Sequence, residues 1–121
     1  MEYISEETLH NIGLAIQGMM RGVAVSKVRK IAESCTNFKI GKTGERLEER
    51  RNQPDYKDTY MHIKEIYTSK NAEEVDKMEA DLIHQFILNS KCDNQKEGFL
   101  SQSDKMKNSD VYRVYVVWND K

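Results

Sequence analysis

The first third of the chain carries hydrophobic residues at the spacing of an α-helix. Ser5 is a suitable N-cap, and the two glutamates that follow it are favourable in a first helical turn. Apolar side chains then recur every three or four residues and share one helix face: Leu9, Ile12, Ala15, Met19 and Val23. Because Gly18 and Gly22 weaken the middle of this segment, we expect a break within 22–25 and a second helix that ends near residue 35.

The rest of the chain alternates strand and helix patterns. Three segments have the alternation, or the β-branched and aromatic content, of strands, and they lie at 37–42, 59–68 and 111–118. Helix periodicity is present in the short, charged segment 45–52 and in the longer segment 71–89. The stretch 90–109 is polar and turn-rich, and Pro54 lies in a segment whose composition is typical of a loop.

This order of elements predicts an α+β fold. We expect a small three-stranded, mostly antiparallel sheet flanked by helices, with two or three helices packed on one face. The 121 residues are enough for one compact domain and too few for two ordinary ones. Within that unit, we expect an N-terminal helical segment over 1–35 and an α+β part over 36–121.

Charge and composition favour a cytoplasmic protein with a local phosphate-binding surface over a membrane or secreted protein. The whole chain has a formal net charge of −1, but residues 27–51 carry eight Lys/Arg against four Asp/Glu, a local +4 that can bind phosphate. Cys35 and Cys92 have no metal-site or CxxC spacing, which favours reduced thiols and a cytoplasmic protein. No run of about 18 apolar residues is present, and the N-terminus is acidic, so we expect neither a membrane span nor a signal peptide.

One acidic residue lies where a helix should be apolar. On a helical wheel of 71–89, Val75, Leu82 and Phe86 define a buried stripe, and Glu79 falls in the middle of it. A buried carboxylate is costly unless a cation compensates it. Two interpretations are open: Glu79 forms a buried ion pair with a lysine or arginine, or it points into a cleft as a metal ligand or general base.

The strand at 37–42 is followed by a basic segment. Arg46, Arg50 and Arg51 lie in the short helix that begins near Glu45, and Arg50 is directed toward the end of the strand. A guanidinium there could hold a phosphate by two hydrogen bonds, although a solvated helix with internal ion pairs is the alternative. The "GKT" of this segment is not a P-loop, because residue 36 would have to be glycine and is threonine.

Taken in order, these segments resemble a known family. "FKIGKT", then Leu47-x-x-Arg50, a strand, a helix carrying "MEADLIHQF", and "CDNQKEG" are similar to the second half of the GIY-YIG nuclease domain. The closest likeness is to the small "KIGKT" versions in phage and bacterial proteins, and it covers roughly residues 36–98. The resemblance implies a three-stranded sheet flanked by helices, hydrolysis of a DNA phosphodiester, and a divalent metal ion, usually Mg²⁺.

The resemblance also assigns roles to particular residues. Arg50 would stabilise charge on the phosphate, Glu79 would bind the metal ion, and Gly41 would let the backbone approach the substrate. Asn94 would order the site, and Tyr56 matches a family tyrosine or histidine. The other residues expected to contact substrate are Phe38, Lys39, Lys42, Arg46 and Arg51.

The family's first strand, with the tyrosine that is the general base, has no counterpart before Phe38. That region reads "VAVSKVRKIAESC" and contains no tyrosine. In one account the catalytic strand is lost and the domain binds without cutting. In the other, the strand at 111–118 takes its place beside Phe38–Lys42, a permuted sheet in which Tyr112 or Tyr115 supplies the phenol.

Three functional hypotheses follow. The leading one is a metal-dependent endonuclease-like domain that uses Mg²⁺ at Glu79 and phosphate stabilisation by Arg50. The second is an inactive module on the same scaffold that binds nucleic acid, a nucleotide or a protein partner, and the third is a phage-type interaction or inhibitory factor. The glycine-containing N-terminal helix is in addition a candidate surface for homo-oligomer formation.

Overall fold

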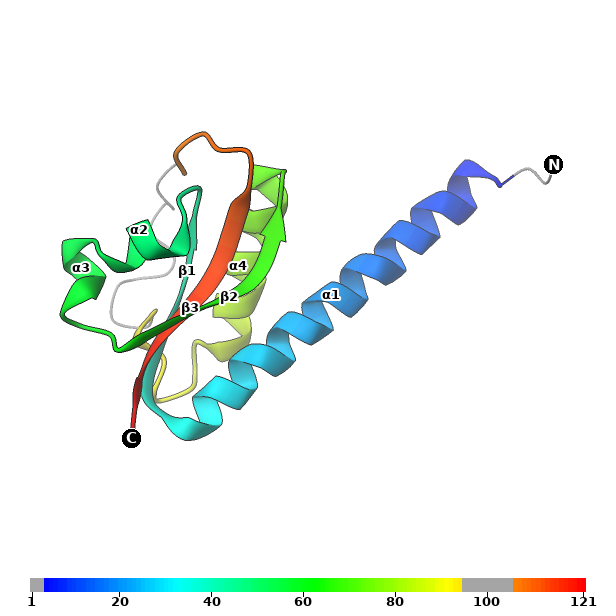
Figure 1. Ribbon diagram of the computed structural model, residues 1–121. Helices are drawn as coiled ribbons and strands as arrows, with labels where there is room; N and C mark the ends of the chain where they lie inside the picture. Colours follow the sequence, from blue (N-terminus) through cyan, green and yellow to red (C-terminus); the bar gives the residue numbers. More distant parts are fainter. Residues whose placement is uncertain (1–3, 95–105) are drawn as a thin grey trace.

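The computed structural model describes residues 4–94 and 106–121, which form an α+β fold (Figure 1). The elements in chain order are α1 (Glu6–Ser34), β1 (Cys35–Thr43), α2 (Leu47–Arg51), α3 (Pro54–Lys57), β2 (His62–Ser69), α4 (Ala72–Phe86) and β3 (Tyr112–Asp120). The predicted fold class is confirmed. Pro54, expected in a loop, is instead the first residue of the short α3, a position where proline's missing N–H costs no hydrogen bond.

The last strand of the chain lies in the centre of the sheet. The strand order is β1-β3-β2, and β3 runs antiparallel to both neighbours. Its register with β1 pairs Ile40 with Val116 and Gly41 with Tyr115. The C-terminal strand therefore does lie beside Phe38–Lys42, as one of the two accounts of the missing strand requires.

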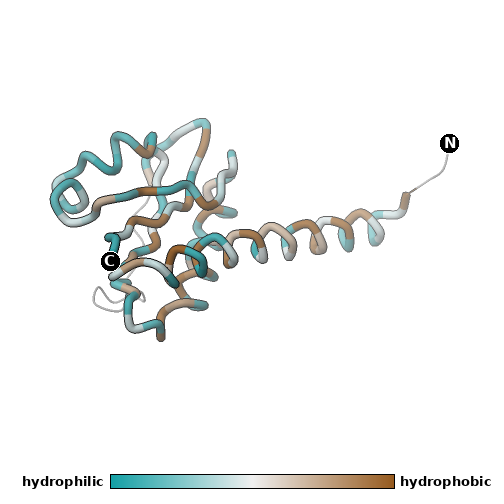
Figure 2. The backbone as a smooth tube through the Cα atoms, turned by 60° about the horizontal axis from the view of Figure 1, so that its bottom comes forward, coloured by the Kyte–Doolittle hydropathy of each residue, from teal (hydrophilic) through white to brown (hydrophobic). Residues whose placement is uncertain are grey.

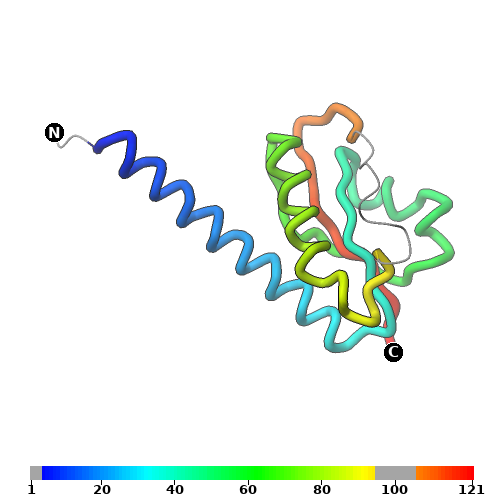
Figure 3. Tube along the Cα trace, turned by 180° about the vertical axis from the view of Figure 1, so that it is seen from behind, coloured from blue at the N-terminus to red at the C-terminus, as the bar shows by residue number. Residues whose placement is uncertain are grey.

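Helices cover both faces of the sheet, because β3 is apolar on both sides. Val114 and Val116 face a core that contains α4 and the second half of α1. Tyr115 and Val117 face the opposite side, where they pack with Tyr56 and other residues of the α2–α3 region. Figures 1 and 3 show α4 and the end of α1 on one side of the sheet and α2–α3 on the other. The expectation of two or three helices on one face is thus met by α1 and α4, while α2 and α3 cover the opposite face.

The expected break in the first helix is wrong, because α1 is continuous over 29 residues. Ser5 caps it as predicted by accepting a hydrogen bond from the Thr8 N–H. Gly18 and Gly22 lie in open space, and each costs about 1 kcal/mol in a helix, which weakens α1 without interrupting it. The buried residues of α1 are all in its second half and belong to the common core: Ala24, Val28, Ile31 and Ala32.

The open edge of β1 is covered by the segment that follows α4. Phe38 donates a backbone hydrogen bond to the Lys91 carbonyl at 2.9 Å. Asn94 then binds both backbone groups of Ile40: its Oδ1 accepts from the N–H and its Nδ2 donates to the carbonyl, each at 2.9 Å.

Within the described residues, no helix is both long and apolar enough to cross a membrane.

Candidate functional site

The ring of Tyr115 lies against the backbone of Gly41 in the neighbouring strand. A β-carbon built on Gly41 would lie 2.4 Å from both Cζ and Oη of Tyr115, so only glycine leaves room for the ring. Tyr115 is 1% exposed, and its hydroxyl is 2.8 Å from that of Tyr56. The space at Gly41 that the resemblance assigns to an approaching substrate is thus filled by this side chain.

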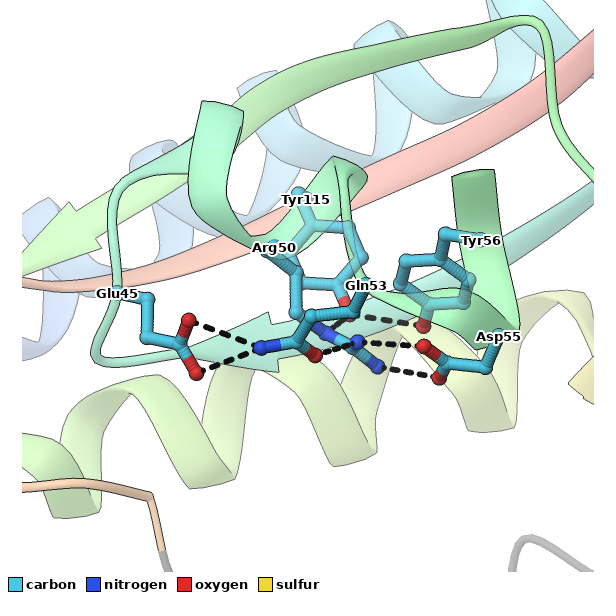
Figure 4. Close-up of polar contacts among 6 residues, drawn as sticks. All are labelled: Glu45, Arg50, Gln53, Asp55, Tyr56 and Tyr115. Carbon is cyan, nitrogen blue, oxygen red and sulfur yellow. Dashed lines mark hydrogen bonds and ion pairs between the residues drawn. The ribbon is translucent and has the colours of Figure 1, made fainter. Parts of the chain in front are cut away.

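Arg50 meets this tyrosine from α2. Its Nε donates a hydrogen bond to the Tyr115 hydroxyl at 2.9 Å, and its guanidinium lies 3.9 Å from the centre of the Tyr56 ring. Figure 4 shows the three side chains converging on one point from α2, α3 and β3. The structure therefore unites Arg50, Tyr56 and Tyr115, three of the residues expected to form a site.

The outer edge of the Arg50 guanidinium is occupied by Asp55. Two parallel hydrogen bonds of 3.0 Å join Nη1 and Nη2 of Arg50 to the two carboxylate oxygens (Figure 4). The hydrogen bonds from Arg50 lower the pKa of Asp55 and keep its carboxylate ionised. This is the two-point geometry in which arginine also binds phosphate, so Asp55 occupies the donor groups that a phosphate would need.

Gln53 connects the same guanidinium to a second carboxylate. Its Oε1 accepts a hydrogen bond from Nη1 of Arg50, and its Nε2 lies 2.9 Å from both oxygens of Glu45. Sequence patterns miss Asp55, Gln53 and Glu45, because residues separated by a turn have no periodic relation to Arg50. The nearby Pro54 is the one signal that the chain folds back at this point.

The hydroxyl of Tyr115 keeps its proton at neutral pH. Burial, followed by the neighbouring Tyr56, raises its pKa above the ordinary value of 10, and the opposing effect of Arg50 is smaller. A protonated phenol can donate a hydrogen bond but cannot accept a proton as a base. In this arrangement Tyr115 positions Arg50, which differs from the general-base role that the resemblance implies.

Glu79 is desolvated on α4, as its place in the apolar stripe predicts. Its side chain is 14% exposed and lies 3.7 Å from Nζ of Lys42 on β1. Asp76, one helical turn earlier, lies 2.5 Å from the same nitrogen. Burial raises the pKa of Glu79 to about 7, with Lys42 opposing and Asp76 adding to the shift. Of the two interpretations, the ion pair with a lysine is present.

Lys39 couples the two groups of charges electrostatically. Its ammonium lies 5.2 Å from the centre of the Tyr56 ring, and its positive charge lowers the pKa of Asp55 and opposes the rise at Glu79. Asn94 holds the backbone of the next residue on β1, Ile40, by two hydrogen bonds and so fixes this part of the strand. Lys39 on β1 therefore acts on both charge clusters, that of Arg50 and Asp55 and that of Lys42, Asp76 and Glu79.

Other residues expected at the site lie elsewhere. Phe38 is fully buried against Phe86, and Tyr112 belongs to the same core on the α4 side of the sheet. Arg51 donates to the Met61 carbonyl at 3.0 Å and so holds α2 to the chain before β2. Arg46 is exposed at the N-cap of α2. Of the "CDNQKEG" motif, residues 95–98 lie outside the described residues.

The carboxylates of α4 are the donors available for the implied Mg²⁺. Among the described residues, no group of three or more His, Cys, Asp or Glu side chains could hold a metal ion. Mg²⁺, however, often uses only one or two carboxylates and completes its shell with water and substrate phosphates. Asp76 and Glu79 fit that donor set, and both already lie against a cation, the Lys42 ammonium.

Comparisons with known proteins add no relative: no family model, curated protein or solved structure matches the chain. The GIY-YIG resemblance therefore remains a hypothesis that rests on the sequence motifs.

A first prediction concerns the contact between Gly41 and Tyr115. Gly41→Ala places a methyl group in the volume of the tyrosine ring. We expect a loss of about 1–3 kcal/mol in the free energy of unfolding, measured in urea, because the ring must shift. The matched change Gly18→Ala, at a helix position with open space, should stabilise by up to about 1 kcal/mol. Equal effects at the two positions would contradict the packing described.

A second prediction concerns the pH dependence of stability. Between about pH 4.5 and 7, folded Glu79 retains a proton that its unfolded form, with the ordinary pKa of 4.5, has released. Its contribution to stability should therefore be full at low pH and be lost as pH rises toward 7. Glu79→Gln removes this titration, so the variant should exceed the parent by roughly 1–3 kcal/mol at pH 8 and match it near pH 4.5.

The measurement is urea unfolding of both proteins across that pH interval. Glu73→Gln, an exposed change on the same helix, reports the effect of removing one surface carboxylate. A difference between Glu79→Gln and the parent that does not grow with pH would show that Glu79 titrates normally.

Proposed function

We propose that this chain is a GIY-YIG-like, metal-dependent endonuclease that hydrolyses a phosphodiester of a nucleic acid, most naturally DNA. The observation that carries the proposal is the place of Tyr115. The resemblance requires a tyrosine on a strand beside "KIG", and β3 brings Tyr115 opposite Gly41 and within 2.9 Å of Arg50. A permuted order of strands accounts for the absence of such a strand before Phe38.

In this proposal Arg50 binds the scissile phosphate. Its guanidinium, held at Nε by Tyr115, would turn its outer edge from Asp55 to two phosphate oxygens. There it would stabilise the charge that develops as water attacks phosphorus. Lys39 adds a second positive charge on the same side of the sheet. Tyr115 is a positioning residue, because its hydroxyl keeps its proton.

Glu79 would hold the divalent metal ion. When bound there, Mg²⁺ would polarise the phosphate and lower the pKa of a coordinated water. A pKa of about 7 leaves Glu79 ionised in a large fraction of molecules at neutral pH, and binding of a cation would complete the ionisation. Lys42 must then release the carboxylate, which Asp76 assists by providing a second partner for the ammonium.

The second candidate is a module on the same scaffold that binds nucleic acid without cutting it. The Lys42 ammonium favours it, because it lies 3.7 Å from Glu79 and 2.5 Å from Asp76 and supplies a positive charge at the carboxylates. Such a module would grip phosphates with Arg50 and Lys39 alone. The two candidates share the phosphate contact and differ in whether Glu79 ever takes a metal ion.

A third prediction separates the endonuclease from the non-cutting binding module by assaying cleavage. The parent chain should nick supercoiled plasmid in Mg²⁺ and stop in EDTA. Arg50→Ala and Glu79→Gln should each lower the rate about 100-fold or more, because each removes charge stabilisation in the transition state. Two exposed changes, Lys70→Ala and Glu73→Gln, serve as controls for the lost charges and should leave the rate unchanged.

Binding is measured in parallel by gel shift of a labelled oligonucleotide. A chain that never cuts but shifts the oligonucleotide in a salt-sensitive way, with loss of the shift in Arg50→Ala, would establish the binding module instead. If neither cutting nor a shift is seen, both proposals fail.

A fourth prediction concerns Asp55. Asp55→Asn removes the carboxylate that competes with phosphate for Arg50, so the oligonucleotide should bind more tightly, by roughly threefold to tenfold. Asp58→Asn makes the same change of charge at an exposed position three residues away. Equal gains in the two variants would assign the effect to net charge and contradict direct competition at the guanidinium.

A further inference from the structure

The first part of α1 extends away from the sheet as a single helix (Figure 1), and among the described residues the hollow that it forms with α4 begins at Leu14. Of the ten large hydrophobic side chains that the described residues leave exposed, eight lie between Ile4 and Val23. Figure 2 shows hydrophobic positions recurring along this projecting part. The exposed apolar side chains are therefore concentrated on one element, and such a contiguous surface is typical of an interaction site.

Five of these side chains form a heptad seam. Leu9, Ile12, Ile16, Met19 and Val23 follow one another at intervals of three, four, three and four residues, the a/d spacing of a coiled coil. They are 55%, 47%, 50%, 71% and 55% exposed, respectively. The helical spacing of the sequence places four of them on one face with Ala15, and the structure shows that this face is turned to solvent.

The seam is distinct from the stripe that joins α1 to the domain. The inner stripe, which includes Ala24, Val28 and Ile31, lies roughly a third of a turn around the helix from the seam. The hollow between α1 and α4, lined by Leu14, Met78 and others, is on the side of the inner stripe. The domain thus uses one face of α1 and leaves the heptad face uncovered.

The heptad spacing fits pairing with a second helix, and the charges along α1 indicate in which direction that helix would run. Between Thr8 and Met20 the helix has no Asp, Glu, Lys or Arg, so no like charges oppose pairing along the seam. Acidic residues lie at its first turn and exposed basic residues, including Lys27 and Lys30, at its second half. Glu6 and Lys27 both occupy e positions of this heptad, which face each other when two helices run antiparallel.

We propose that α1 pairs antiparallel with α1 of a second copy of this chain, through the seam of Leu9, Ile12, Ile16, Met19 and Val23. This direction places Glu6 of each copy near Lys27 of the other and opposes the two helix dipoles. Gly13 and Gly22 flank the seam, and a β-carbon at either position would meet no atom within 4 Å, so the two backbones can approach closely there. A membrane surface is a poorer partner, because the projecting segment has no Lys or Arg before Arg21.

Sedimentation equilibrium of the full chain tests the proposal. At roughly 10–100 μM, above the micromolar dissociation constants of weak protein interfaces, the mass should be twice that of the 14.1 kDa chain. Ile16→Glu buries a charge in the seam and should give a monomer with an unchanged circular dichroism spectrum of the domain. Asn11→Glu adds the same charge to an exposed position outside the seam and should remain a dimer.

Charge reversal tests the direction. Glu6→Lys and Lys27→Glu should each raise the dimer dissociation constant by roughly threefold to tenfold, since each converts two attractive pairs into repulsive ones. The double variant Glu6→Lys/Lys27→Glu should restore the parent value. In a parallel pair these two residues lie at opposite ends of the helices, so the single variants would show no loss for the double variant to restore.

Three outcomes would overturn the proposal. These are a monomeric parent chain at 100 μM, a dimeric Ile16→Glu, and a double variant weaker than both single ones. Phosphatidylcholine and phosphatidylglycerol vesicles are included as an alternative partner. Binding of a monomeric parent chain to either vesicle, abolished by Ile16→Glu, would assign the seam to a lipid surface instead.

Discussion

The contact between the Tyr115 ring and the bare backbone of Gly41 is the constraint on which the candidate site depends. It exists because β3 enters the sheet between β1 and β2 in a register that makes the two residues partners. With the ring in place, its hydroxyl is the point to which Arg50 and Tyr56 are both bound. A shift of one residue in this register would turn the tyrosine to the core side of the sheet and leave Arg50 without its inner partner.

Arg50 and Glu79, on either side of β1, each lie against an oppositely charged side chain of the same chain. Asp55 covers the outer edge of Arg50, and Lys42 lies beside Glu79 and Asp76. In the proposed function, a phosphate would displace Asp55 from Arg50, and a metal ion would displace Lys42 from Glu79. The raised pKa of Glu79 shows that compensation there is incomplete, which is a cost in stability that a bound cation would relieve.

The long helix α1 contributes to two surfaces of different character. Its second half supplies part of the core that supports β1 and β3 from the α4 side. Its first two thirds carry a heptad seam that the domain does not cover. Because a helix transmits its direction over its whole length, the packing of Val28 and Ile31 also determines where the seam points. The domain fold and the proposed pairing of two copies are thus linked through a single rigid element.

The sequence by itself determined the type of each long element, the α+β class, and the place of Glu79 in an apolar stripe, because these depend on periodicity within one segment. It also placed Arg50 one helical turn beyond a strand. It did not decide which of Tyr112 and Tyr115 lies beside Gly41 and Arg50, the face on which α2 and α3 pack, or the pairing of Arg50 with Asp55. The predicted break in α1 failed because glycine weakens a helix locally, while the backbone hydrogen bonds on both sides continue through it. Only the tertiary structure settled these points, since strand order and ion-pair partners depend on which distant segments are buried together.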